Sequence, residues 1–387
     1  MTDSTVRGTC DPRFGPVADA FQALHEAGLD QGSACAVYWQ GELLVDLWAG
    51  SRNREGLPWE RDTLVNIFSV SKAVTAICVQ LAVDMGLLAL ERPVTYYWPE
   101  YGVAGKRNTR VQWLLNHRAG QPALKTPMPA EALYDWERMT ATLAAEQPWW
   151  EPGTRHGYHM ISYGWLVGEV FRRALGISVG RFLREEVAGP LGLDLHLGVA
   201  DSDLYRIARL RPADGPPQAG RVGLYQHVMD QPHSVTAAAL TNPITITTGG
   251  NTREWQQAEL PAVNMHATAR ALATLFGKIS GDEGVLSAAA RRRCQQEESR
   301  GPDPVLLTPT RFGPGFMLQQ LGDPEAELGP GAGAFGHPGA GGALALADPD
   351  RHLGFAYTMN RMGPHVLVDP RPRRLLAAVY QCLEAVT

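Results

Sequence analysis

The chain has 387 residues, of which 44% are hydrophobic and 19% are charged, so it can form a globular protein with a substantial core. Its formal net charge of -5 and its lack of long basic runs argue against nucleic acid or an anionic membrane surface as the main partner. No secretory-type apolar segment follows the N-terminus, and no apolar run reaches the roughly eighteen residues of a membrane span, so we expect a cytoplasmic protein.

The five cysteines are odd in number and widely spaced, a pattern that predicts buried free thiols rather than a disulfide framework or a zinc cluster. The nearest histidine pair, His156 and His159, lacks the His-Glu-x-x-His arrangement and a matching set of carboxylates. We therefore expect no metal site.

The first predicted element is a β-hairpin over residues 33–48. Two runs rich in β-branched and aromatic residues flank a turn at Gln40-Gly41-Glu42. Such runs around a glycine-containing turn are typical of two antiparallel strands.

A helix follows, and it carries the most informative pair of residues, Ser69 and Lys72. Its apolar residues recur at steps of four and three, which predicts a buried amphipathic helix; they are Val70, Val74, Ile77, Leu81, Met85 and Leu88. Lys72, one of only four lysines, therefore occupies a position where a charge is unfavourable.

Burial would keep the Lys72 amine neutral and able to accept the proton of Ser69, one turn away. Ser69 falls at or near the helix start, where unpaired backbone amides would stabilise an oxyanion. The alternative is an N-cap serine beside a lysine whose charged end reaches solvent, and Ser-x-x-Lys alone leaves both interpretations open.

Between about residues 85 and 200 the signals are helical, as in segments 111–117 and 161–175, with Pro- and Trp-rich loops between them. Tyr158 lies in the loop before the second of these helices. A phenol beside a protonated lysine would have a lowered pKa and could exchange a proton with a serine. Ser178 matches Gly-x-Ser-x-Gly, but a helix rather than a strand precedes it, so we interpret it as an N-cap.

Three more strands are predicted at 315–320, 334–347 and 353–360, before a helix at 372–385, and residues 211–223 are predicted to form a surface loop. Strands at both ends without regular β-α alternation indicate an α+β fold with an antiparallel sheet flanked by helices. We predict a discontinuous α/β domain (1–84 and 200–387) and an inserted, mostly helical domain (85–199), with the site in the cleft between them.

The segment Gly336-His-Pro-Gly-Ala-Gly-Gly starts a strand with proline and glycines instead of branched side chains. Pro338 predicts a sheet edge, since proline cannot donate to a ladder, and the glycines permit close approach by another group. An edge open to a substrate would explain both features, and a bulge or sheet corner is the alternative.

Three motifs in this order resemble the serine β-lactamase and penicillin-binding-protein superfamily, and within it the family VIII carboxylesterases. They are Ser69-x-x-Lys72, Tyr158 after a Pro-Gly-Thr turn, and His337-Pro-Gly; the resemblance spans roughly residues 20–385 and includes segments 62–69, 114–120 and 158–169. No single motif is specific, but the ordered set is.

The resemblance implies a β-lactamase-like fold and an acyl-enzyme mechanism without metal or cofactor. It implies Ser69 as the nucleophile, Lys72 and Tyr158 as shared base and acid, and the backbone amides of Ser69 and Ala340 as the oxyanion hole. The expected substrate-binding residues are Phe68, Trp149, Trp150, His337 and Gly339, with a preference for short acyl groups.

Two departures from the superfamily pattern favour a neutral ester over an anionic antibiotic. Met160 replaces the usual asparagine that would bind a lactam side chain, and His337, mostly neutral at pH 7, replaces a lysine. The predicted function is hydrolysis of a small carboxylic ester. Alternatives are an acyltransferase, a weak β-lactamase or DD-peptidase at the same site, and a non-catalytic binding protein; the oligomeric state is not predicted.

Overall fold

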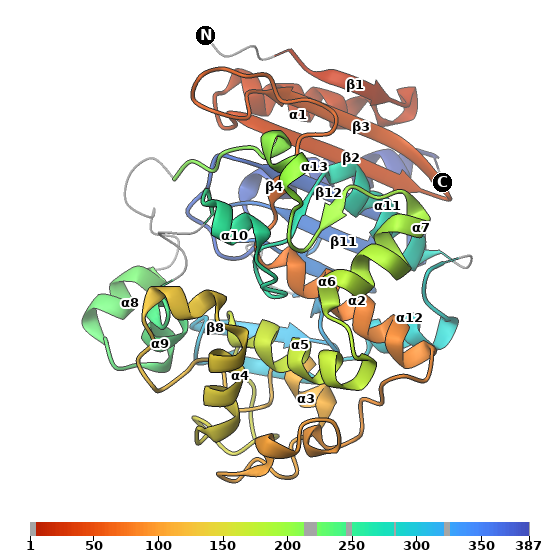
Figure 1. Cartoon of the computed structure of the whole chain (residues 1–387). Helices are drawn as coiled ribbons and strands as arrows, with labels where there is room; N and C mark the ends of the chain where they lie inside the picture. The colour runs from red at the N-terminus through yellow and green to blue at the C-terminus, as the bar shows by residue number, and fades with distance from the viewer. Residues whose placement is uncertain (1–4, 213–222, 245–249, 282–283, 321–325, 387) are drawn as a thin grey trace.

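The computed structural model describes residues 5–212, 223–244, 250–281, 284–320 and 326–386. A nine-stranded antiparallel sheet runs through it in the order β1-β3-β2-β12-β11-β10-β9-β8-β7 (Figure 1). The strands are β1 (Arg7–Cys10), β2 (Gly32–Trp39), β3 (Glu42–Gly50), β7 (Ser299–Asp303), β8 (Thr308–Phe312), β9 (Met317–Leu318), β10 (Phe335–Pro338), β11 (Leu344–Asp348) and β12 (Leu353–Met359).

The pairing of β2 with β12 joins the two ends of the chain, with Ala36 opposite Ala356. This confirms the predicted antiparallel sheet built from both termini, and the predicted hairpin is β2 and β3. The sequence analysis missed β1 and the hairpin of β7 and β8. Pro302 and Pro309 oppose each other in that hairpin, which is possible because β7 is an edge strand and β8 pairs with β9 only at Phe312.

The predicted strand at 334–347 is wrong in detail, because it is two strands, β10 and β11, joined by a turn. Pro338 therefore ends β10 and does not mark a sheet edge, since β10 lies between β9 and β11. However, β9 pairs only with Phe335 and Gly336, so the end of β10 at His337 and Pro338 has a strand partner on one side alone.

Helices cover the large sheet, and a small second sheet lies among the other elements. Helix α11 (Ala269–Ser280) packs on β2, β11 and β12, whereas α1 (Gly15–Glu26) packs on α13 (Pro370–Val386). The other α-helices of four or more residues in the described ranges are α2 (Val70–Asp84), α3 (Val111–Leu115), α4 (Trp136–Ala145), α5 (Ser162–Leu175), α6 (Val179–Phe182), α8 (Leu224–Asp230), α9 (Val235–Thr241), α10 (Arg253–Gln257) and α12 (Ala288–Gln295). A second sheet contains β4 (Val65–Asn66), β6 (His266–Ala267) and β5 (Leu195–His196).

The predicted helices at 111–117, 161–175 and 372–385 correspond to α3, α5 and α13. The described residues between Gly50 and Ser299 contribute no strand to the large sheet, as expected for a helical insertion. The domain boundaries at 84 and 200 stay a prediction, and most of the predicted loop at 211–223 lies outside the described residues. No helix in the described ranges has the length and apolar character needed to cross a membrane.

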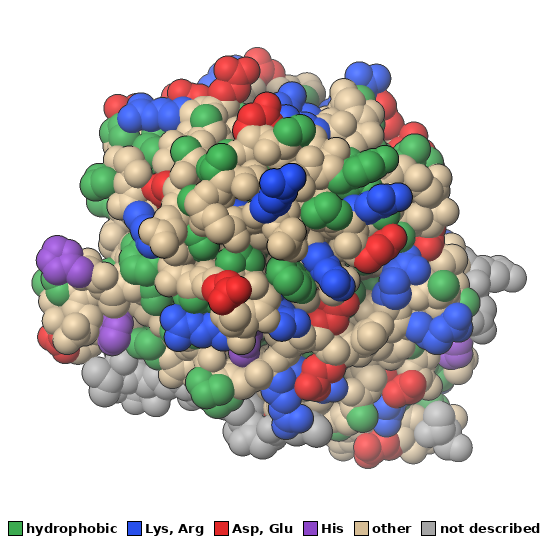
Figure 2. All heavy atoms as spheres, turned by 90° about the horizontal axis from the view of Figure 1, so that it is seen from below, with side chains coloured by type: hydrophobic (Ala, Val, Ile, Leu, Met, Phe, Trp, Pro, Cys, Tyr) green, Lys and Arg blue, Asp and Glu red, His purple; other side chains and the backbone are tan. Residues whose placement is uncertain are grey.

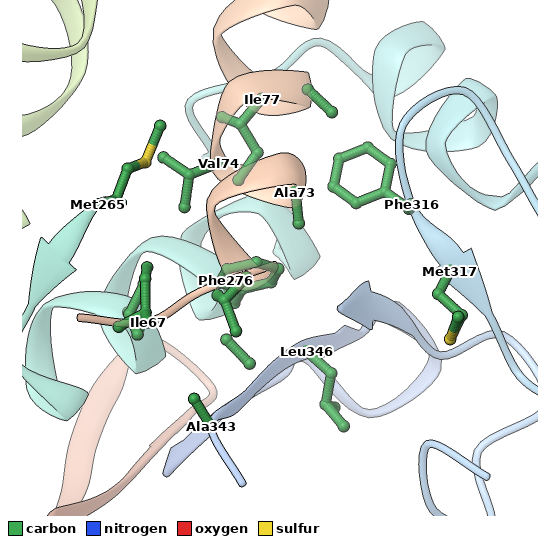
Figure 3. Close-up of a cluster of buried hydrophobic side chains, with 14 of the residues drawn as sticks. Ile67, Ala73, Val74, Ile77, Met265, Phe276, Phe316, Met317, Ala343 and Leu346 are labelled. Carbon is green, nitrogen blue, oxygen red and sulfur yellow. The ribbon is translucent and has the colours of Figure 1, made fainter. Parts of the chain in front are cut away.

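Helix α2 lies at the centre of the molecule, and its burial differs from the prediction. Every residue from Val70 to Gln80 is buried, so the helix is enclosed on all sides and not along one face. Figure 3 shows Ala73, Val74 and Ile77 of this helix among core side chains from β9, β11 and α11. Lys72 is consequently surrounded by protein.

The contact between β12 and α11 provides a test of the packing. A Cβ atom on Gly354 would lie 2.2 Å from Gly277 N and 2.3 Å from Ala273 O, and neither backbone atom can move alone. We expect Gly354→Ala to lower the free energy of unfolding by at least about 2 kcal/mol. Gly15→Ala is the matched control, because a Cβ there meets nothing within 4 Å. Equal free energies of unfolding for the two variants in urea denaturation would contradict this packing.

Candidate active site

Ser69 occupies the N-cap position of α2, as predicted, but its side chain does not cap the helix. The preceding residue, Phe68, has a φ of +44°, a left-handed conformation that few non-glycine residues adopt. The Ser69 hydroxyl instead lies 3.2 Å from Lys72 Nζ and 2.9 Å from the phenolic oxygen of Tyr158. The alternative of an ordinary N-cap serine is therefore wrong.

Lys72 has 0% exposure, so its amine does not reach solvent. Besides Ser69 Oγ, Nζ contacts the carbonyl oxygen of Ala262 at 3.1 Å, and both partners are uncharged. Burial without a paired carboxylate lowers the pKa of Lys72 well below its usual value. A neutral amine keeps a lone pair and can accept the Ser69 proton.

Tyr158 lies in the loop before α5, and its amide holds that loop in place. The Tyr158 N–H donates to both carboxylate oxygens of Asp303, at 3.1 and 2.9 Å. Asp303 ends β7 and also accepts from the amides of Val305 and Leu306 and from the hydroxyl of Thr310. The buried carboxylate thus ties the tyrosine loop to the large sheet.

The lowered pKa predicted for Tyr158 is wrong. Burial raises the pKa of its phenol, the hydrogen bond with Ser69 opposes that effect, and the Asp303 charge adds to it. The prediction assumed a protonated lysine nearby, whereas burial favours the neutral form of Lys72. Tyr158 is therefore a phenol at neutral pH, suited to donate a proton rather than to accept one.

Three aromatic rings surround Tyr158. Their centroids lie 5.0 Å (His117), 6.1 Å (Phe312) and 5.8 Å (His337) from that of Tyr158. His337 Nδ1 is 2.7 Å from the carbonyl oxygen of Pro338, and because a carbonyl only accepts, this nitrogen carries the proton. Burial and the nearby Lys72 lower the pKa of His337 to about 3, so the ring is neutral at pH 7.

The turn between β10 and β11 brings Ala340 toward the start of α2. A Cβ on Gly339 would lie 2.4 Å from the carbonyl oxygen of Ile67, and one on Gly341 would lie 2.4 Å from Met362 Cε. These glycines thus accommodate protein groups, which corrects the idea that they leave space for a substrate. Within the described residues, the backbone amides of Ser69 and Ala340 donate to no backbone oxygen, as an oxyanion hole requires.

The expected substrate-binding aromatics differ in their surroundings. Phe68 is 8% exposed and adjoins Ser69. The Trp149 N–H donates to Ala123 O at 2.9 Å, and the Trp150 N–H donates to Arg155 O at 3.1 Å, so both indoles are anchored to backbone. Trp150 also packs against Gly157, next to Tyr158. The substrate-binding roles of these residues stay predictions.

Ser178 is the N-cap of α6, as predicted, because its side chain accepts from Arg181 N at 3.1 Å. Its hydroxyl donates to Glu259 at 3.0 Å, so the Gly-x-Ser-x-Gly match has a structural explanation. The sequence analysis missed His117, Asp303 and Phe312, which lie around Tyr158. Asp303 sits within Gly-Pro-Asp-Pro, which is typical of a turn, so the local sequence gave no sign of its role.

Comparison with known proteins agrees with this geometry. The sequence profile named Beta-lactamase matches residues 17–380, and the protein therefore belongs to the β-lactamase family. The esterase/β-lactamase LipL of Mycobacterium tuberculosis is 32% identical, over 94% of this chain and 85% of its own length.

Two solved structures cover 98% of this chain and 100% of their own, each with a TM-score of 0.88. One is a penicillin-binding protein homologue from Caulobacter crescentus, which is 36% identical. The other is a family VIII carboxylesterase, which is 33% identical. The predicted β-lactamase-like α+β fold and the resemblance to family VIII carboxylesterases are confirmed.

The neutral state of Lys72 predicts how the stability of the protein depends on pH. A lysine that is protonated in the unfolded chain and neutral in the folded chain makes unfolding easier as the pH falls. Over the pH range in which Lys72 is neutral in the folded protein and protonated in the unfolded chain, the free energy of unfolding should therefore rise more steeply with pH in the wild type than in Lys72→Met, by up to about 1.4 kcal/mol per pH unit. Equal slopes in denaturant titrations would mean that Lys72 is charged in the fold.

Proposed function

We propose that the protein is a serine hydrolase that cleaves small carboxylic esters through an acyl-Ser69 intermediate. The observation that carries the proposal is the convergence of a buried, uncharged amine and a phenol on one serine hydroxyl at a helix start. An amine base, a phenolic acid and a primary alcohol are together sufficient for acyl transfer.

In acylation, Ser69 Oγ attacks the ester carbonyl while its proton moves to Lys72 Nζ. The amides of Ser69 and Ala340 hold the resulting oxyanion. The carbon–oxygen bond to the alcohol then breaks, Tyr158 protonates the departing alkoxide, and Lys72 returns a proton to Tyr158. In deacylation, water attacks the acyl carbonyl and gives a proton to Lys72 Nζ. The bond between the carbonyl carbon and Ser69 Oγ then breaks, Tyr158 protonates Ser69 Oγ, and Lys72 returns its proton to Tyr158 as the carboxylic acid leaves.

The residues around the serine favour a neutral substrate. The pKa of His337, about 3, leaves no positive charge there for a substrate carboxylate. Met160, which is buried, provides no amide for a lactam side chain. Esterase is part of the name of the Mycobacterium relative and of an esterase, EstB, from Burkholderia gladioli that is 27% identical over 52% of this chain. We propose short-acyl esters, and Phe68 and Gly339 as contacts.

β-Lactam hydrolysis is the second candidate, because the same relative is also named a β-lactamase and a penicillin-binding protein homologue shares the fold. Acyl transfer to an alcohol or amine would use the same intermediate. A non-catalytic binding protein on this scaffold is the candidate from another class.

We propose a cytoplasmic location, since all five cysteines are free thiols and four are buried. We also propose that the partner is a small-molecule ester and not nucleic acid or a membrane, because of the charge distribution on the surface. Figure 2 shows basic and acidic side chains interspersed over the face seen from below Figure 1, without a single-sign region. A mixed surface of this kind does not attract a polyanion.

Covalent labelling tests the nucleophile directly. A fluorophosphonate should add one phosphonyl group to the peptide that carries Ser69, because the hydroxyl is activated by Lys72. Lys72→Ala and Tyr158→Phe should each slow hydrolysis of p-nitrophenyl acetate by at least about 100-fold. Ser178→Ala is the control, with activity close to wild type. An unlabelled Ser69 in folded protein would favour the non-catalytic binding protein.

The charge argument predicts the choice between substrates. We expect kcat/KM for p-nitrophenyl acetate to exceed that for nitrocefin, since His337 is neutral and Met160 cannot bind a lactam amide. Addition of an alcohol during ester turnover measures acyl transfer in the same assay. Faster cleavage of nitrocefin than of the ester would contradict the role given to these two residues.

A further inference from the structure

The turn that carries Ala340 accepts a hydrogen bond from a buried arginine, Arg371, near the start of α13. We infer that Arg371 is a positioning residue that fixes the direction of the Ala340 amide. The inference rests on the proposed function, in which that amide binds the oxyanion. Its evidence is a contact between the guanidinium and the neighbouring residue, Gly341.

Arg371 is 6% exposed, and each of its five N–H donors has an acceptor. Nε and Nη2 donate to the two carboxylate oxygens of Asp369, at 2.9 and 3.1 Å. Nη1 donates to Asp30 at 2.8 Å and to the carbonyl oxygen of Arg361 at 2.9 Å. The remaining Nη2 hydrogen reaches the carbonyl oxygen of Gly341 at 2.6 Å. The guanidinium therefore cannot rotate without losing a buried hydrogen bond.

The contact at Gly341 completes the anchoring of the turn. Gly363 N also donates to Gly341 O, at 2.7 Å, and Gly341 N donates to His365 O at 3.0 Å. On the other side of Ala340, Gly339 N donates to Ala343 O at 2.7 Å. The polar groups of both neighbours are thus paired, and the Ala340 amide is left as the donor that can face a substrate.

Gly342 lets the guanidinium approach this closely. A Cβ there would lie 2.5 Å from Arg371 Nη2, and the φ of +132° is itself unsuited to other residues. The glycines of the third motif are therefore explained in part by Arg371. The sequence analysis assigned this close approach to a substrate, whereas at Gly342 the group is a side chain of the protein itself.

The cluster acts through geometry and not through its charge. Two carboxylates, those of Asp30 and Asp369, surround the one guanidinium. The formal charge of this three-residue cluster is therefore -1, and its field would not favour an oxyanion. Asp30 is fixed in turn by the hydroxyls of Tyr357 and Ser33. A lysine could not replace the arginine, because three donors on one nitrogen cannot reach both carboxylates and both carbonyls.

The test compares Arg371→Lys with the wild type in ester turnover and in the affinity of phenylboronic acid, whose tetrahedral serine adduct places an oxygen at the oxyanion site. We expect kcat to fall about 10- to 100-fold with KM changed less than about threefold, and boronic acid affinity to fall in parallel with kcat. Each rate is divided by the concentration of protein that a fluorophosphonate labels.

Arg206→Lys is the matched control, since Arg206 binds Asp194 and Asp203 away from the turn; it should leave both measurements unchanged.

If Arg371→Lys does not fold, Asp369→Asn is the second variant, because it keeps the arginine but loses one acceptor. It should show the same parallel fall in kcat and boronic acid affinity, several-fold in size. Unchanged kcat, a fall in kcat without weaker boronic acid binding, or failure of both variants to fold would overturn the inference. A wild type that binds the boronic acid but hydrolyses no ester would contradict the proposed function, and the affinity ratio would still test Arg371.

Discussion

The site depends on one constraint, the burial of the Lys72 amine among uncharged partners. Full burial of a lysine without a carboxylate opposes folding, and the enclosed position of α2 imposes it. The carbonyl of Ala262 gives the amine one fixed partner, and the adjacent carbonyl of Pro261 is held by the hydroxyl of Thr75 at 2.8 Å. The unfavourable burial is what leaves the amine free to act as a base near neutral pH.

The other reacting groups reach Ser69 from separate parts of the fold. Tyr158 comes from the loop before α5 and is tied to the sheet through Asp303, whereas Ala340 comes from the turn between β10 and β11. Each is anchored through backbone atoms by a buried charged side chain, Asp303 in one case and Arg371 in the other. Buried polar groups of this kind hold a loop in a single arrangement when all their hydrogen bonds are made.

Local sequence patterns were sufficient to predict helices, helix ends and the burial of residues on a helix, since these features depend mainly on nearby residues. The apolar spacing after Ser69 indicated a buried helix and a buried Lys72, and Gly176 before Ser178 indicated a helix end and a new N-cap. The convergence of Tyr158 and His337 on this helix was expected only from the resemblance to a family. No local pattern relates residues so far apart in the chain.

The errors have physical causes as well. The lowered pKa expected for Tyr158 assumed a protonated lysine beside it, whereas burial of the phenol itself raises that pKa and burial of Lys72 favours the neutral amine. Asp303 and Arg371 lie in Gly-Pro-Asp-Pro and Pro-Arg-Pro-Arg-Arg, which are typical of exposed turns and helix starts. Their roles arise from long-range hydrogen bonds that composition does not predict.

The protonation state of Lys72 can be measured directly, because the chain has only four lysines. Lysine labelled with 13C at the ε position should give four resolved NMR signals, assigned with Lys72→Met and Lys106→Arg. Burial also lowers the pKa of Lys106, to about 8, which makes its assignment necessary. The account predicts that the Lys72 signal titrates well below the pH at which an ordinary lysine does and reaches the shift of a neutral amine on the alkaline side of that titration. A Lys72 signal that titrates near pH 10, like an ordinary lysine, would contradict it.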